Sequence, residues 1–193
     1  MALIICGTQG SGVNTFEQRC DYHNIASDNL YKIYITNRRA MKTGHSPISG
    51  PFLNETNIDS MIEELESQFP ALYDHLMKFH IDRPVWTQCA PEFGKWIVEN
   101  KSSDNHNVLI VSAPIDIQCE RLFAREKIRD PRLVGKSNSY QLVKPEYIKE
   151  IESHAADVSW LESNADYHMN NDGTLEQYNA AIDIVLNECN LLE

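Results

Sequence analysis

The glycine-rich turn Gly7-Thr8-Gln9-Gly10-Ser11-Gly12-Val13-Asn14-Thr15 lies between the apolar run ALIIC, residues 2–6, and a segment of helical pattern, residues 13–23. A strand that turns into a helix through the pattern G-x-x-x-x-G-K-[ST] is typical of a phosphate-binding loop. Gly7 and Gly12 stand at the spacing of the two outer glycines. Val13 occupies the position of the lysine, and Thr15 comes one place later than the hydroxyl residue of the pattern.

The turn is predicted to bind an anion mainly through its backbone. The N–H groups of a glycine-rich turn and of a helix N-terminus attract phosphate without needing particular side chains. The side chain at the lysine position cannot reach phosphate oxygens as a lysine does. The residues predicted to surround the phosphate are Gly7, Gly10, Ser11, Gly12, Val13, Asn14 and Thr15. The alternative is a tight turn that binds nothing, because glycine also suits such a turn for steric reasons.

Apolar runs and segments of helical pattern alternate over the rest of the chain. Strands are predicted at residues 2–6, 31–36, 84–88, 108–112 and 165–169. Helices are predicted at 13–23, 58–79 with a break at Pro70, 91–100, 114–127, 145–162 and 173–189, the last with a buried face that begins at Leu175. This alternation favours an α/β fold in which helices cover both faces of a parallel sheet. The length of 193 residues fits a single domain over 1–193.

The composition excludes several classes of protein. A net charge of −11 disfavours general binding to a nucleic-acid polymer or to an anionic membrane. The chain has no run of about 18 apolar residues, the length of a membrane-spanning helix, and its start lacks the basic segment of a signal peptide. The five cysteines are widely spaced, which indicates free thiols in a reducing compartment. We therefore expect a cytoplasmic protein. The histidines at 80, 106, 154 and 168 are interpreted as ordinary core or surface residues without carboxylate partners.

Positive charge is concentrated in residues 119–149. This segment carries a net charge of +4 in a chain that is otherwise strongly acidic. Arg121 and Arg125 share a helix face at the spacing i, i+4. The sequence suggests that one polyanion is bound jointly by Arg125, Arg129 and Arg132, because guanidinium groups fit phosphate oxygens. A solvated basic face with local ion pairs is the alternative, and the glycine-rich turn favours phosphate chemistry.

Two further segments carry a family resemblance. The segment VLIVSAPIDIQCERLFAR, residues 108–125, contains Ala-Pro followed by Gln-x-x-Arg-Leu-x-x-Arg. It resembles the strand–helix unit of dephospho-coenzyme A kinases. The segment ADYHMNNDGTLE, residues 165–176, is similar to that family and to phage-type deoxynucleoside monophosphate kinases. The resemblance covers the first 20 residues and roughly residues 88–190.

The resemblance implies a P-loop kinase-type three-layer fold with about five parallel strands and a lid at roughly residues 126–143. It implies that Arg121 and Arg125 are catalytic and face the donor or the transferred phosphate. Residues 171–174 would lie near the donor base. Thr15 would supply a hydroxyl to Mg²⁺, which would act together with ATP. The implied activity is transfer of the γ-phosphate of ATP to a nucleotide-like acceptor, with a deoxynucleoside monophosphate preferred over dephospho-coenzyme A.

The sequence gives fewer indications of which residues bind the phosphate acceptor. The resemblance suggests that Asp28 acts as a base or orients the acceptor, and an ordinary surface aspartate is the alternative. Arg38 and Arg39 are predicted to bind the acceptor phosphate, together with Gln88 at the carboxyl end of a strand, where ligands bind in open α/β sheets. The apolar stripe over residues 58–79 suits a core face, a lid helix or a homodimer face.

Val13 is the main departure from the kinase pattern. Loss of a lysine that contacts phosphate removes several kcal/mol of transition-state stabilisation by an order-of-magnitude estimate. A lid arginine, Arg38, Arg39 or Lys42 is a candidate replacement. The alternative hypothesis is a catalytically silent relative of the kinases that binds a nucleotide or a protein partner. A third hypothesis is an interaction protein that docks its basic 119–149 segment on an acidic partner.

Overall fold

The computed structural model describes residues 1–29, 69–101, 105–129 and 145–192. Its centre is a five-stranded parallel sheet in the order β2-β3-β1-β4-β5. The strands are β1 (Ala2–Gly7), β2 (Ser27–Asn29), β3 (Val85–Cys89), β4 (His106–Ser112) and β5 (Tyr167–Asn170). The helices are α1 (Val13–Tyr22), α4 (Phe69–Phe79), α5 (Pro91–Asn100), α6 (Ile115–Arg129), α7 (Pro145–Ser153), α8 (Ala155–Asn164) and α9 (Leu175–Glu188). The predicted α/β class and the parallel sheet are confirmed.

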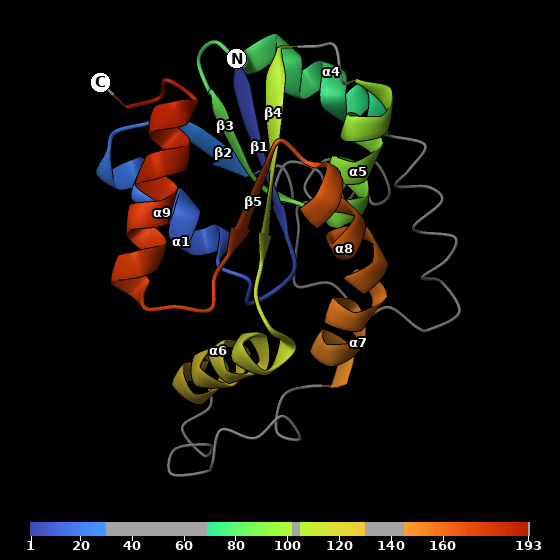
Figure 1. The fold of residues 1–193 in the computed structure, drawn as a ribbon, viewed down its shortest axis with the longest axis vertical. Coiled ribbons are helices and arrows are strands. Elements are labelled where there is room, and N and C mark those ends of the chain that lie inside the picture. The colour runs from blue at the N-terminus through green and yellow to red at the C-terminus, as the bar shows by residue number, and fades with distance from the viewer. Residues whose placement is uncertain (30–68, 102–104, 130–144, 193) are drawn as a thin grey trace, which may run out of the picture.

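The sheet is covered on both faces, as Figure 1 shows. Side chains of β1 alternate between the two faces. Leu3 and Ile5 pack in a cluster with α1 and α9, whereas Ile4 and Cys6 pack in a second cluster with α4, α5 and α8. The central strands β1 and β4 are almost continuously apolar because helices bury both of their faces. Helices α6 and α7 lie beyond the carboxyl ends of the strands (Figure 1).

Most predicted elements agree with the structure to within two or three residues, and several differ in informative ways. Residues 27–29 form the edge strand β2, which the sequence does not predict because Ser, Asp and Asn have low strand propensity. The predicted helix 145–162 is divided into α7 and α8 at His154. Leu175 is 65% exposed in the first turn of α9, so its predicted burial is wrong. The predicted strand 31–36 lies outside the described residues. So does the predicted lid, except for residues 126–129, which continue α6.

The described part of the chain agrees with two predictions from composition. All five cysteines are buried and free. Within the described residues, none of the helices combines the length and the apolar character that crossing a membrane requires.

The start of α9 is fixed by a capping box. The hydroxyl of Thr174 accepts the Gln177 N–H at 3.2 Å, and Gln177 Oε1 accepts the Thr174 N–H at 2.9 Å. Replacing Thr174 by alanine is expected to lower the free energy of unfolding by about 1 kcal/mol. Thr174→Ser retains the hydroxyl and serves as the control. Urea unfolding of both variants checks this; equal losses would show that the hydroxyl does not cap the helix.

Helices α1 and α9 are joined by Asp183. Its carboxylate accepts the Arg19 Nε–H at 2.7 Å and lies 2.9 Å from His23 Nε2. Hydrogen bonding to Arg19 lowers the pKa of Asp183. This contribution to stability is complete above the ordinary aspartate pKa of about 3.9 and is lost as the pH falls through the lowered value. In urea unfolding from about pH 6 down to about pH 3, Asp183→Asn is expected to lose less stability than the wild type. Identical pH profiles would contradict this.

Candidate functional site

The glycine-rich turn leaves β1 at the carboxyl edge of the sheet and enters α1 at Val13. Two of its glycines have backbone angles that favour glycine, with φ of 81° at Gly10 and 119° at Gly12. Space is also restricted there. A Cβ on Gly10 would lie 2.9 Å from the Gln118 carbonyl oxygen, and one on Gly12 would lie 2.1 Å from Asn171 Nδ2. The loop therefore requires glycine at both positions.

The N-terminus of α1 is open to an anion. Its N-cap, Gly12, makes no side-chain cap, and its first turn contains no acidic residue. The first N–H groups of a helix lack intrahelical partners and carry partial positive charge. In the same loop, the hydroxyl of Ser11 is buried and has no hydrogen-bond partner among the described residues. This arrangement meets the backbone requirement of a phosphate-binding loop.

Arg121 on α6 braces the loop through its backbone carbonyls. Its Nη1 donates to the carbonyls of Gly10 at 3.1 Å and Ser11 at 3.4 Å. Its Nη2 donates to the carbonyl of Asn171 at 2.9 Å and to its side-chain oxygen at 3.0 Å. Burial lowers the pKa of Arg121. Because an arginine stays protonated in proteins, a positive charge lies beside the loop carbonyls.

The segment that follows β5 holds the same loop from a second direction. Asn171 Nδ2 donates to the Ser11 carbonyl at 2.7 Å, and the Tyr178 hydroxyl donates to the Gly12 carbonyl at 3.2 Å. Burial raises the pKa of Tyr178, which keeps its hydroxyl protonated as a donor. The structure places the Asn171 side chain against the loop, and its position near a donor base stays a prediction.

Gln118 supports the loop from α6. Its Oε1 accepts the Thr8 hydroxyl at 2.7 Å, and its Nε2 donates to the Ala113 carbonyl at 2.6 Å. Gln118 is 5% exposed. The resemblance to the kinase strand–helix unit therefore includes two residues, Gln118 and Arg121, whose described contacts stabilise the loop.

The three residues that replace the lysine and hydroxyl of the pattern point in different directions. Val13 is 4% exposed and packs in the core with Leu3 and Phe16. Asn14 is exposed, and its side-chain oxygen accepts a hydrogen bond from the Gln88 amide. Thr15 is half-buried in the first turn of α1. No side-chain cation therefore stands at the lysine position.

Gln88 reaches the loop because β3 is bulged. Two residues of β1, Ile4 and Cys6, align with Trp86 and Cys89, so β3 contains one extra residue in this interval. Gln88 lies in the bulge with φ of 60°. A bulge of this kind redirects a side chain at the end of a strand. The structure thus brings Gln88 to the loop.

Arg125 lies one helical turn after Arg121. Its Nη2 donates to Gln9 Oε1 at 3.3 Å, which places a second guanidinium beside the loop. Arg129 is the last residue of α6. Arg132, Arg38 and Arg39 lie outside the described residues, so their predicted roles stay predictions.

Asp28 is not brought to the loop. It lies on β2 in register with Trp86, which aligns with Ile4 of β1, three residues before Gly7. Three residues of a β-strand span roughly 10 Å, so Asp28 lies about that far from Gly7 along the strand direction. The Asp28 carboxylate forms an ion pair with Arg83 and accepts the Asn29 N–H at 2.7 Å. These contacts suit the alternative interpretation of Asp28 as a surface residue.

Two histidines have carboxylate partners that the sequence analysis did not foresee. His154 Nδ1 lies 2.7 Å from Glu92 Oε1, and His168 Nε2 lies 3.5 Å from Glu162 Oε1. Each pair joins separate elements, so no local spacing could indicate it. Among the described residues, no three His, Cys, Asp or Glu side chains form a group suited to a metal.

Comparison with known proteins bears on the fold. No model of a protein family matches the chain, and no curated protein matches its sequence. Solved structures do match. TT1252 from Thermus thermophilus is 18% identical, with 97% of each chain covered and a TM-score of 0.59.

Two kinases are similar over almost their whole length. Shikimate kinase from Bacteroides thetaiotaomicron is 17% identical, with 98% of this chain and 99% of that chain covered and a TM-score of 0.53. Dephospho-CoA kinase from Campylobacter jejuni is 15% identical, with 97% and 96% covered and a TM-score of 0.51. The chain has the fold of the P-loop kinases. In this P-loop fold, the glycine-rich loop occupies the connection between β1 and α1.

Proposed function

We propose that this protein transfers the γ-phosphate of ATP to a nucleotide-like acceptor, with a deoxynucleoside monophosphate as the preferred class. The observation that carries the proposal is the loop between β1 and α1. Its uncapped helix N-terminus is held by hydrogen bonds that all engage loop carbonyls, from Arg121, Asn171 and Tyr178. The kinase fold and the resemblance of residues 108–125 and 165–176 support the same activity.

The loop would bind phosphate oxygens through the N–H groups of Gly10, Gly12, Val13 and Asn14, whereas the Ser11 N–H donates to the Thr8 carbonyl at 3.2 Å. Phosphoryl transfer depends mainly on positioning and on neutralising the charge of the moving group. With Val13 in the core, the positive charge would come from α6. Arg121 would polarise the loop peptides through their carbonyls, and Arg125, beside Gln9, would face the transferred phosphate.

Magnesium would accompany ATP. Mg²⁺ prefers oxygen ligands and usually retains several waters besides substrate phosphates. The Thr15 hydroxyl and the Asn14 side-chain oxygen lie in the first turn of α1 and fit such a sparse ligand set. When bound, the ion would neutralise phosphate charge. The residues of the chain would orient the phosphates, with Gln88 holding the Asn14 amide.

The acceptor would bind near the carboxyl end of β3. Gln88 already lies there beside the loop, and Arg38 and Arg39 are the proposed ligands of the acceptor phosphate. Asp28 is a weaker candidate for the base, because its carboxylate is paired with Arg83.

Calorimetric titration with ATP and Mg²⁺, followed by a transfer screen, tests the proposal. The screen uses the deoxynucleoside monophosphates and dephospho-coenzyme A. Saturable ATP binding and phosphorylation of one deoxynucleoside monophosphate are expected. Binding followed by transfer only to dephospho-coenzyme A would overturn the acceptor class, and absence of ATP binding would overturn the proposal.

A catalytically silent nucleotide-binding protein is the second candidate. It is favoured by the burial of Val13, which leaves the lysine position without a cation. In this case the natural chain would bind ATP without transfer, and Val13→Lys would create transfer activity. ATP turnover by the natural chain that Arg125→Ala abolishes would exclude this candidate.

A further inference from the structure

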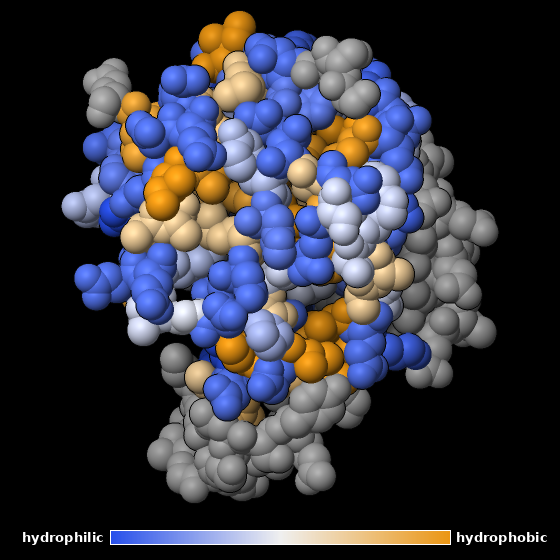
Figure 2. Space-filling view, in the orientation of Figure 1, coloured by the Kyte–Doolittle hydropathy of each residue, from blue (hydrophilic) through white to orange (hydrophobic). Residues whose placement is uncertain are grey.

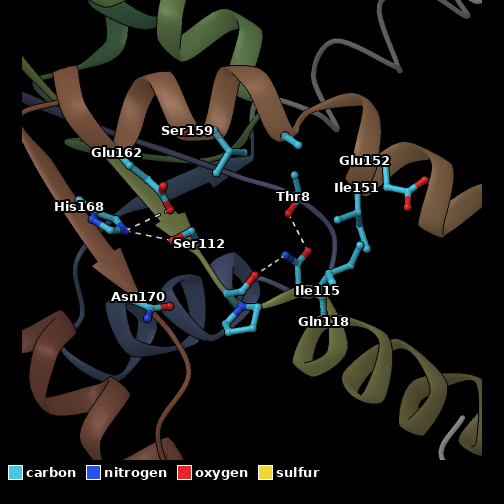
Figure 3. A pocket seen from close by; sticks show the side chains of 14 residues that line it. Thr8, Ser112, Ile115, Gln118, Ile151, Glu152, Ser159, Glu162, His168 and Asn170 are labelled. Carbon is cyan, nitrogen blue, oxygen red and sulfur yellow. Dashed lines mark hydrogen bonds and ion pairs between the residues drawn. The ribbon is translucent and has the colours of Figure 1, made fainter. Parts of the chain in front are cut away.

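A cavity of about 410 Å³ lies between the carboxyl ends of β4 and β5 and the helices α6, α7 and α8. Figure 3 shows its lining, which includes Thr8 and Gln118 but no residue of α1. The volume falls in the range of roughly 300–1,000 Å³ that is usual for small-molecule sites. Thr8 of the loop and Gln118, which supports the loop, therefore form part of the cavity lining, but the cavity does not reach α1.

Part of the hydrogen-bond donor capacity of the described lining is already used within the protein. The Thr8 hydroxyl and the Gln118 amide donate to partners within the protein, at 2.7 Å and 2.6 Å. The Asn170 amide nitrogen donates to Asp172 at 2.8 Å. The carboxylates of Glu152 and Glu162 only accept when ionised.

Charge and shape further restrict the occupant. The described lining contains two carboxylates and no lysine or arginine, so it disfavours a phosphate or a carboxylate ligand. Pro114, Ile115, Ile151 and Val158 supply apolar surface. In Figure 2, apolar surface gathers where β4 leads into α6, below a hollow in the surface.

The polar end of the cavity is formed by Ser112, Glu162 and His168. Ser112 Oγ lies 3.0 Å and Glu162 Oε1 lies 3.5 Å from the same atom, His168 Nε2. A serine–histidine–carboxylate catalytic triad needs the serine and the carboxylate on different ring nitrogens. The group is therefore not arranged for nucleophilic catalysis. It presents a carboxylate beside further polar atoms, which suits a ligand that donates hydrogen bonds.

We infer that this cavity binds a small organic cation, with an ammonium or guanidinium group on a compact apolar body. The cationic group lies against the Glu162 carboxylate and Ser112, and the apolar body lies on Ile115 and Ile151. This inference goes beyond the proposed function and does not rest on it, because the cavity is distinct from the phosphate loop.

Titration with benzylamine tests the inference. The resonances of the His168 imidazole are followed by NMR at about pH 8, where benzylamine is still protonated. Two compounds with the same ring serve as controls: benzyl alcohol, which is uncharged, and benzoate, which is negatively charged. Benzylamine is expected to shift the His168 resonances saturably and to bind about tenfold more tightly than either, since hydrogen bonds between charged groups are stronger than neutral ones.

Glu162→Gln removes the charge and keeps the shape of an exposed side chain. It is expected to weaken benzylamine binding about tenfold or more. Glu99→Gln, which neutralises an exposed carboxylate on α5 outside the cavity, is the matched control and is expected to leave the affinity unchanged. No saturable shift, equal binding of benzyl alcohol or benzoate, or equal effects of the two variants would overturn the inference. ATP binding does not enter these measurements.

Discussion

Gly12→Ala is expected to abolish measurable ATP binding while the domain remains folded. The added Cβ would lie 2.1 Å from Asn171 Nδ2 and 3.1 Å from the Tyr178 ring, at a φ of 119° that side chains rarely adopt. Backbone strain of this kind costs about 1–3 kcal/mol. Displacing Asn171 also removes a hydrogen bond to the Ser11 carbonyl, which costs about 1–3 kcal/mol when the acceptor is left buried. Together these losses weaken ATP binding by on the order of a hundredfold or more.

Gly173→Ala is the matched control for this experiment. Gly173 lies in the turn before α9, and its Cβ would lie 2.6 Å from Gln177 Oε1, so the change disturbs the capping box of α9 and leaves the phosphate-loop contacts in place. Gly173→Ala is expected to lose far less ATP affinity than Gly12→Ala, because its added Cβ does not contact the loop between β1 and α1. Calorimetric titration gives both affinities, and circular dichroism checks folding. If Gly12→Ala bound ATP as tightly as Gly173→Ala, the loop would not be the nucleotide site.

Arg121→Ala is expected to lower both stability and ATP affinity. The change leaves four acceptors without the guanidinium, namely the carbonyls of Gly10, Ser11 and Asn171 and the Asn171 side-chain oxygen. Loss of a charged hydrogen-bond donor of this kind costs about 1.5–3 kcal/mol. Arg121→Lys is expected to recover only part of the loss, because one ammonium group cannot reproduce the geometry of the guanidinium. Urea unfolding and calorimetric titration measure the two effects.

Arg125→Ala separates the proposed roles of the two arginines. Its hydrogen bond to Gln9 at 3.3 Å engages a side chain and no backbone group of the loop, so Arg125→Ala is expected to cost less stability than Arg121→Ala. The rate of phosphate transfer is expected to fall about 10²–10³-fold, as when a group that stabilises transition-state charge is removed. If Arg121→Ala changed neither stability nor affinity, or if Arg125→Ala transferred phosphate at the wild-type rate, the assigned role of that arginine would be wrong.

The parts of the fold that could be predicted from the sequence are those with strong local patterns. The apolar runs of β1 and β4 and the Pro91 start of α5 predict their elements because burial on both faces and proline geometry act locally. The glycine-rich turn between β1 and α1 is equally local, since its glycines are required by backbone geometry. Strand β2 could not be predicted, because three polar residues become a strand only by pairing with β3.

The candidate site was predicted as a set of residues, but its internal contacts were not. Arg121 was predicted to face phosphate, which stays a prediction, and its hydrogen bonds to the loop carbonyls depend on how α6 packs against the loop. Gln88 reaches Asn14 only because of the bulge in β3. His154 pairs with Glu92 from α5, more than 60 residues earlier, and His168 lies beside Ser112 of β4, more than 50 residues earlier. In each case the decisive contact is tertiary.

The most direct test of the central claim, that the loop between β1 and α1 binds the phosphates of ATP, is calorimetric titration of the wild type and Gly12→Ala with ATP and Mg²⁺. Saturable binding by the wild type that Gly12→Ala abolishes is the predicted result. A wild-type chain that shows no binding, or a variant that binds as tightly as the wild type, would contradict the claim.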